Sequence, residues 1–338
     1  MKIAHPQARV LVTGGAGFIG SHLVDFLVDA GCRVTVLDNF RNGKRENLTE
    51  ASRTGRLRVI EGDVTDPLAC EQAVRDGTDA VFHLACLGVR HSLHNPMENH
   101  QVNAMGTLQL LQAVRKAGTG RFVYMSTSEV YGAALAFPLT EQAATWPTTV
   151  YGASKLAGEH YSSAFHGCYG LPVVRVRTFN NFGSRAHFHG DSGEVIPRFI
   201  LRALAGEPPV IFGDGLNTRD FLYVKDCARG LVEIAESDAL VGDLVNLGYG
   251  KETSIVELAG LVLEAVGRTD LQPLHGVKRP GDVPRLKVDS TKLFKATSFT
   301  PRTSLAEGLA MTVEHYRAVF KAQPDCLEQM TARNWEVA

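Results

Sequence analysis

The sequence predicts an α/β protein with a doubly wound parallel sheet and a smaller C-terminal lobe. Three observations carry this prediction. Short runs rich in β-branched residues alternate with segments of helical apolar spacing in the first half of the chain. A glycine-rich turn follows the first run. Beyond about residue 178 the elements become shorter, and Pro and Gly become more frequent, which indicates a second lobe.

Each β-branched run is expected to form one strand of the parallel sheet. Amphipathic segments between the runs, such as the one that contains Ile19, Leu23 and Phe26, supply the crossover helices. The expected domains are residues 1–178 and residues 179–338, with later segments returning to the first domain. The six runs are RVLVTGG (9–15), RVTVLD (33–38), LRVIEGD (57–63), DAVFHLA (79–85), RFVYMS (121–126) and LPVVRVR (171–177).

Composition and charge exclude several functional classes. With 338 residues, of which 44% are hydrophobic, the chain can bury a large core. The net charge of −1 gives no basic field for nucleic acid. Six cysteines without metal-ligand spacing predict reduced thiols and no metal site. The first strand starts near Arg9, and no apolar run is long enough to span a membrane. We therefore expect a cytoplasmic protein that contacts neither membrane nor nucleic acid.

The glycine-rich turn predicts a Rossmann-type dinucleotide site. Gly14, Gly17 and Gly20 stand between the first strand and its helix, where backbone amides and the helix dipole favour a pyrophosphate. Asp38 ends the next strand, where a carboxylate can accept hydrogen bonds from the adenosine ribose and would repel a 2′-phosphate. NAD is therefore the expected cofactor, although three cations that follow leave NADP open: Arg41, Lys44 and Arg45.

A tyrosine and a lysine are spaced for catalysis. In YGASK, Tyr151 and Lys155 lie on one face of a predicted helix. A phenolate at neutral pH requires about 4 kcal/mol of stabilisation, which is roughly what one nearby ammonium supplies at an intermediate dielectric. With the positive nicotinamide of NAD, Lys155 is expected to make Tyr151 a base for a substrate hydroxyl.

Over nearly its whole length, the chain resembles an extended short-chain dehydrogenase/reductase of the nucleotide-sugar epimerase/dehydratase group. The resemblance rests on TGGAGFIG, GDVTD, HLAC, VNAMGT, STSEVYG, YGASK, RTFNNFG, FGDGLNTRDFLYVKD and RPGDVPR. It implies a homodimer formed through residues 104–117 and 151–168, and a nucleotide-sugar substrate, most often a UDP-sugar. The sequence departs from the group at Cys86 and at FGSR (182–185).

The resemblance also implies a role for each matching residue. Asp63 and Val64 would contact the adenine, and Thr127 would bind the sugar hydroxyl that is oxidised. The substrate contacts implied are Arg90, Thr127, Asn180, Arg219 and Arg279. The cofactor contacts implied are Gly14, Gly17, Phe18, Ile19, Gly20, Asp38, Asn39, Asp63, Val64, Leu84, Ala85, Asn103, Tyr151 and Lys155.

The reaction that follows oxidation at C4 depends on STSEVYG (126–132). This stretch places Thr127, Ser128 and Glu129 at the end of a strand. It resembles the corresponding strand end of UDP-glucuronate decarboxylases, which form UDP-xylose or a UDP-4-keto-pentose. Arg90, in GVR, suits a charged sugar. Decarboxylation is the first prediction. A 4,6-dehydratase, for which only one carboxylate is apparent, and a 4-epimerase, which has no use for Glu129, stay open, as does a non-catalytic dinucleotide sensor.

Overall fold

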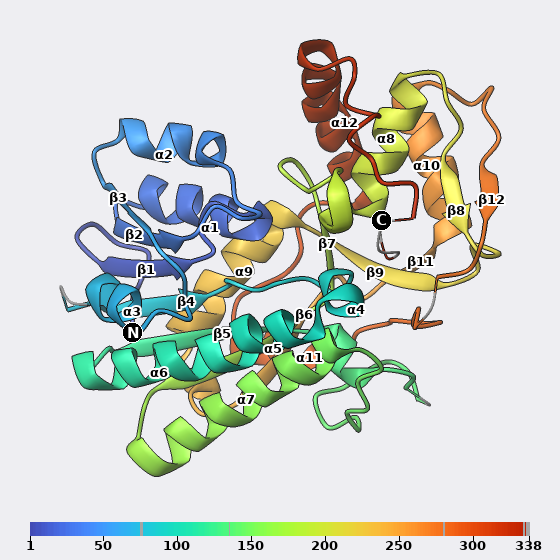
Figure 1. Cartoon of the computed structure of the whole chain (residues 1–338). Helices are drawn as coiled ribbons and strands as arrows, with labels where there is room; N and C mark the ends of the chain where they lie inside the picture. The colour runs from blue at the N-terminus through green and yellow to red at the C-terminus, as the bar shows by residue number, and fades with distance from the viewer. Residues whose placement is uncertain (75–76, 135, 280, 334, 336–338) are drawn as a thin grey trace.

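The protein is built around a seven-stranded parallel sheet (Figure 1). The computed structural model describes all residues except 75–76, 135, 280, 334 and 336–338. All six predicted runs form strands of this sheet, in the order β10-β6-β5-β4-β1-β2-β3, so the predicted fold class is confirmed. The strands are β1 (Arg9–Thr13), β2 (Arg33–Asp38), β3 (Leu57–Glu61), β4 (Ala80–His83), β5 (Arg121–Thr127), β6 (Val173–Thr178) and β10 (Leu244–Leu247).

Helices cover both faces of the sheet (Figure 1). One face is packed by α1 (Phe18–Asp29), α2 (Thr49–Arg53), α9 (Val224–Glu236) and α11 (Thr291–Ala296). The other is packed by α3 (Pro67–Val74), α6 (Gly106–Ala117) and α7 (Val150–Tyr169). Two short helices precede α6, namely α4 (His91–His94) and α5 (Pro96–His100). Because both faces are buried, the strands are almost continuously apolar, as is typical of parallel sheets.

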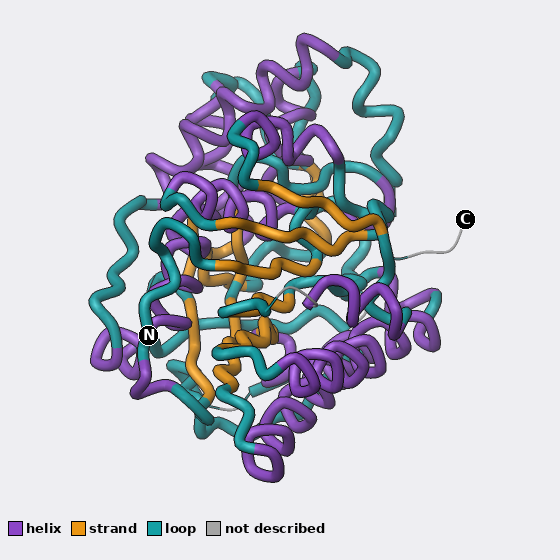
Figure 2. The backbone as a smooth tube through the Cα atoms, turned by 90° about the vertical axis from the view of Figure 1, so that its left-hand side faces the viewer, coloured by secondary structure: helices purple, strands orange, loops and turns teal. Residues whose placement is uncertain are grey.

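The second lobe has its own small sheets and its own core. Three strands form one sheet, β7 (Asn180–Phe182), β9 (Thr218–Tyr223) and β11 (Glu252–Ser254), and two form another, β8 (Val210–Phe212) and β12 (Leu274–Gly276). They pack with α8 (Val195–Leu204), α10 (Ile255–Val266) and α12 (Leu305–Ala322). Figure 2 shows the strands running through the middle of the molecule with helices outside them.

The chain passes more than once between the two lobes. Residues beyond 178 build the second lobe, but β10 and α9 return to the large sheet, where β10 pairs with β6 and α9 packs on α1. The strand order reverses beside β1, with β2 on one side and β4 on the other. Such a switch point leaves a crevice at the carboxyl ends of the strands, where ligands bind in this kind of sheet. Among the described helices, none is both long enough and apolar enough to cross a membrane.

Candidate active site

A single cavity of about 410 Å³ lies at the carboxyl ends of the strands. It extends from the glycine-rich turn at one end to residues of the second lobe at the other. All but one of the predicted site residues line it. They are Gly14, Gly17, Phe18, Ile19, Gly20, Asp38, Asn39, Asp63, Val64, Leu84, Ala85, Arg90, Thr127, Ser128, Glu129, Tyr151, Lys155, Asn180, Arg219 and Arg279.

The glycines of the turn bring the backbone close to the cavity and to the next strand. Gly14 has a positive φ of 69°, and a Cβ on it would lie 2.8 Å from the backbone nitrogen of Ala85. A Cβ on Gly20 would lie 2.1 Å from the carbonyl oxygen of Gly14. Only glycine therefore allows helix α1 to begin directly above β1, with its first amides directed at the cavity. The turn fits the pyrophosphate of a dinucleotide.

Asp38 sits where a ribose-binding acid is required. Its carboxylate accepts hydrogen bonds from the backbone nitrogens of Ala16 (2.9 Å) and Phe40 (2.8 Å), which fix its orientation at the cavity wall. Burial raises the pKa of Asp38, while these two hydrogen bonds act in the opposite direction. Each carboxylate oxygen can accept a second hydrogen bond, so the side chain remains competent to bind a ribose hydroxyl.

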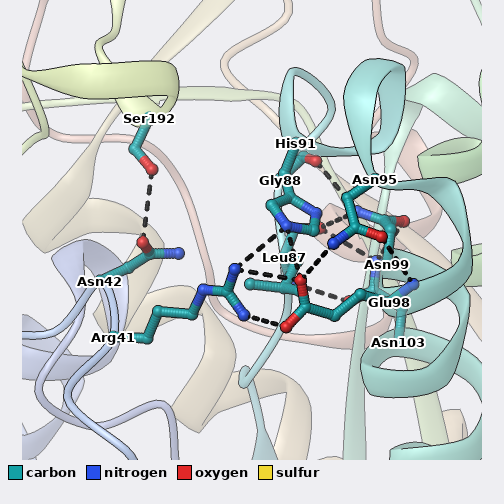
Figure 3. A network of polar contacts seen from close by, with 10 residues as sticks. All are labelled: Arg41, Asn42, Leu87, Gly88, His91, Asn95, Glu98, Asn99, Asn103 and Ser192. Carbon is teal, nitrogen blue, oxygen red and sulfur yellow. Dashed lines mark hydrogen bonds and ion pairs between the residues drawn. The ribbon is translucent and has the colours of Figure 1, made fainter. Parts of the chain in front are cut away.

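The three cations that left NADP open each have another partner. Arg41 forms an ion pair with Glu98 of α5 and contacts the Nε2 atom of His91 at 3.3 Å (Figure 3). Lys44 lies 5.5 Å from the ring centroid of Phe188. Arg45 is paired with Glu61 and stacks on Phe40. Each of the three cations is thus engaged by another side chain rather than held ready for a 2′-phosphate. This arrangement favours NAD over NADP as the cofactor.

Asn103 is predicted to contact the cofactor, and that role stays a prediction. Asn103 is buried behind the cavity and does not line it. Its amide nitrogen donates to the Leu87 carbonyl, and its amide oxygen accepts from the Leu87 nitrogen (Figure 3). It also donates to Asn99 and Ser154. Asn103 therefore holds the loop after β4 in place, and that loop carries Arg90.

The residues predicted to supply the hydroxyl, the phenol and the ammonium all line the cavity. Thr127 ends β5 and hydrogen-bonds Tyr151, near the start of α7. Lys155, one turn later, lies with its Nζ atom 4.6 Å from the ring centroid of Tyr124. Burial raises the pKa of Tyr151, and Cys86 and two carboxylates raise it further. A phenolate on Tyr151 therefore requires positive charge from a bound cofactor as well as from Lys155.

The neighbouring acid, Glu129, has an unusual environment. Its carboxylate lines the cavity, and within the described part of the chain it has no hydrogen bond or ion pair. Burial raises its pKa, against the attraction of Arg219, Arg279 and Arg90. A solvated strand-end carboxylate would show the opposite features, so Glu129 belongs to the reaction space rather than to the surface.

The groups predicted to bind the nucleotide line the opposite wall. Arg219 and Arg279 both pair with Asp282, and Arg219 also donates to the carbonyls of Thr218 and Val283. The amide oxygen of Asn180 is buried and has no partner among the described residues. An unsatisfied amide at a cavity wall is a ready acceptor for a ligand donor.

Glu194 is among the titratable groups of this cavity that the sequence did not predict. Glu194 stands at the start of α8 and lines the cavity together with Glu129 and Tyr151. Burial raises its pKa from 4.5 to about 7. The only signal in the sequence is an acid directly before the apolar run VIPRFIL, which gives no hint of contact with residues about forty positions earlier.

Comparison with known proteins agrees with this geometry. Residues 10–248 match the NAD dependent epimerase/dehydratase family. The chain is 37% identical to a UDP-glucose 4-epimerase of Mycolicibacterium smegmatis, covering 91% of this chain and 98% of the relative. It is 35% identical to UDP-glucuronic acid decarboxylase 1 of Arabidopsis thaliana, covering 93% and 71%.

A solved structure gives the same result. A dTDP-glucose 4,6-dehydratase from Streptomyces venezuelae, solved with NAD bound, superimposes with a TM-score of 0.87 at 34% identity, covering 93% of this chain and 98% of that one. Epimerases, decarboxylases and dehydratases thus have similar sequence identity to this chain. The comparisons therefore support NAD as the cofactor and nucleotide sugars as the substrate class, but they do not distinguish the reaction. The chain is an NAD-dependent enzyme, an extended short-chain dehydrogenase/reductase, and it belongs to the NAD-dependent epimerase/dehydratase family.

Proposed function

We propose that the protein is a nucleotide-sugar lyase that oxidises C4 of the sugar and then removes a group from C5 or C6. The observation that carries this proposal is Glu129, a carboxylate without a protein partner beside Thr127 and Tyr151. Oxidation at C4 makes the C5 proton acidic, and a nearby carboxylate is suited to remove or return it. A 4-epimerase needs no such group.

The first step uses residues at the centre of the cavity. Thr127 orients the C4 hydroxyl, and Tyr151 accepts its proton while Lys155 stabilises the phenolate. When bound, NAD supplies the acceptor for the hydride that leaves C4. Thr127 and Lys155 are buried, which strengthens their electrostatic interactions with a bound substrate.

The nucleotide diphosphate is expected at the opposite wall. Arg219 and Arg279 are guanidinium groups already oriented by Asp282, and bidentate binding of phosphate is their characteristic chemistry. Asn180 offers its amide oxygen to a ligand hydroxyl or N–H. A UDP-sugar is the first substrate to test, as the sequence analysis predicts.

Two groups can leave from the 4-keto sugar. The sequence analysis places decarboxylation of UDP-glucuronate first, and Arg90 supports it because its positive charge reaches Glu129 and a guanidinium can bind a uronate carboxylate. Loss of water from a neutral hexose is the second candidate. It needs two acid–base groups, one at C5 and one at C6, and Glu194 favours it.

The expected assembly and location are also proposals. A homodimer through α6 and α7 would cover Met105 and Tyr169, whose side chains are 47% and 51% exposed. Light scattering tests it, and a monomeric mass would contradict it. The six cysteines are unpaired, which supports a reducing compartment such as the cytoplasm.

A Glu129→Gln variant tests the proposed function. With an accepted nucleotide sugar, it should still form reduced cofactor in a single turnover, while loss of water or carbon dioxide should slow by about 10²-fold or more. Glu264→Gln, an exposed acid on α10, is the matched control. Native turnover by Glu129→Gln would contradict the assignment.

A further inference from the structure

The second lobe contributes an acid to the lining of the cavity. Glu194 is the N-cap residue of α8, with extended backbone angles (φ −92°, ψ 159°), yet its side chain makes no capping hydrogen bond. Its backbone nitrogen donates to the His187 carbonyl at 2.7 Å, and the next residues, Ile196 and Pro197, are buried in the lobe. The backbone of Glu194 is therefore fixed, and the residue lines the cavity.

Glu194 is unlike the structural acids of this protein. Glu159 is buried against Arg177 and Ser126. Asp220 accepts from the backbone nitrogens of Tyr249 and Gly250. The carboxylate of Glu194 has neither a hydrogen bond nor an ion pair within the described part of the chain. A carboxylate shielded from water and without a partner is costly, which is typical of functional groups rather than structural ones.

Glu194 lines the same cavity as Glu129, and its charge acts on Tyr151 as well as on Tyr316 of the second lobe. Both carboxylates raise the pKa of Tyr151, so both act on the group that receives the C4 proton. Arg90 is the charged neighbour that lowers the pKa of Glu194, and it also acts on Glu129. Burial holds the pKa of Glu194 at about 7, so a large fraction of the side chain carries a proton at neutral pH. A protonated carboxyl is a proton donor.

We propose that Glu194 is the general acid that protonates the departing C6 hydroxyl, and that the substrate is therefore a nucleotide-linked neutral hexose. This inference rests on the proposed lyase function. In the elimination, Glu129 takes the proton from C5 and the C5–H electron pair forms the C5–C6 double bond. The C6–O bond breaks as Glu194 gives its proton to that oxygen, and water leaves. Glu129 ends protonated and Glu194 ionised. Return of the C4 hydride to C6, with a proton from Glu129 to C5, would complete a product that is lighter by one water.

The same residue is of no use in decarboxylation. A 4-keto uronate loses carbon dioxide without protonation of the leaving group, so a second acid has no task there. An ionised Glu194 would also place a further negative charge near the uronate carboxylate, beside that of Glu129. Two carboxylates with separate tasks fit water loss better.

The test uses full-length protein with NAD and five probes: UDP-glucose, UDP-N-acetylglucosamine, dTDP-glucose, GDP-mannose and UDP-glucuronate. The wild type should remove water from at least one neutral hexose. Glu194→Gln should slow that loss by about 10²-fold or more, while the exchange of the C5 proton with D2O, which depends on Glu129, persists. Glu194→Asp retains an acid and should dehydrate faster than Glu194→Gln. Glu264→Gln should match the wild type.

A change of leaving group separates a proton donor from a structural residue. On the 6-deoxy-6-fluoro analogue of the accepted hexose, fluoride departs with little need of protonation, so Glu194→Gln should eliminate it at a rate within about tenfold of the wild type. An equal loss of rate on both substrates would overturn the inference. So would native dehydration by Glu194→Gln.

The outcomes also separate this inference from the function on which it rests. If the wild type releases only carbon dioxide from UDP-glucuronate, the assignment of Glu194 fails and the lyase function stands. If it converts a probe to a C4 epimer of unchanged mass without exchange at C5, the lyase function itself fails.

Discussion

The unpaired carboxylate of Glu194 should weaken the protein in a pH-dependent way. Its pKa rises from 4.5 to about 7 on folding because burial disfavours the charged form. The loss of folding free energy caused by Glu194 is therefore absent below about pH 4.5, grows as the pH rises, and reaches its maximum above about pH 7. Replacing Glu194 by Gln removes it, so the variant should be more stable than the wild type at alkaline pH.

The magnitude follows from the same pKa. At about 1.4 kcal/mol for each tenfold change in the acid constant, the upper limit is about 3 kcal/mol. The side chain is partly open to the cavity, so we reduce this to about 1–2 kcal/mol. For 338 residues, an unfolding entropy of about 2 cal/mol/K per residue converts this into a rise in Tm of about 2 °C.

Thermal unfolding without added nucleotide sugar measures this effect. Wild type, Glu194→Gln and Glu264→Gln are compared between about pH 5 and about pH 9. The Tm difference between Glu194→Gln and the wild type should be small at the acidic end and largest at the alkaline end. A lower Tm for Glu194→Gln at alkaline pH, or a difference independent of pH, would refute the reasoning.

Three further substitutions test other parts of the site and the fold. Tyr151→Phe should lower C4 oxidation by about 10³-fold; near-native single-turnover reduction of the cofactor would remove Tyr151 from the base role. Glu98→Gln should release Arg41 and narrow the preference for NAD over NADP in calorimetric binding, and an unchanged ratio would show that the ion pair has no part in selectivity. Glu159→Gln should leave Arg177 without its ionic partner and lower the free energy of unfolding in urea by about 3 kcal/mol, whereas a loss below about 1 kcal/mol would mean that the pair is dispensable.

The large sheet could be predicted because its signals are local. Each of the six runs is rich in apolar and β-branched residues, as is typical of strands that are buried in a parallel sheet. The candidate catalytic residues could be predicted for the same reason, because Thr127 ends a strand and Tyr151 and Lys155 are one helix turn apart. The residues lining the cavity at the glycine-rich turn are likewise close together in sequence.

The rest of the site depends on contacts that no local pattern encodes. Glu194 reaches Tyr151 only because the second lobe folds over the strand ends, and a single acid before a helix predicts an ordinary cap. The sequence pattern also does not show that Asn103 lies outside the cavity lining, where its amide hydrogen-bonds the Leu87 backbone. The partners of Arg41 could not be predicted either, because Arg41 lies in the loop after β2 and Glu98 lies 57 residues later, on α5 (Figure 3).

One measurement tests the central claim most directly. The wild-type protein is incubated in D2O with NAD and each of the five nucleotide sugars, and every product is identified by mass. The account predicts that a neutral hexose loses one water and that deuterium enters at C5, because Glu129 and Glu194 act together on C5 and C6. A product of unchanged mass, inverted at C4 and free of deuterium, would contradict it.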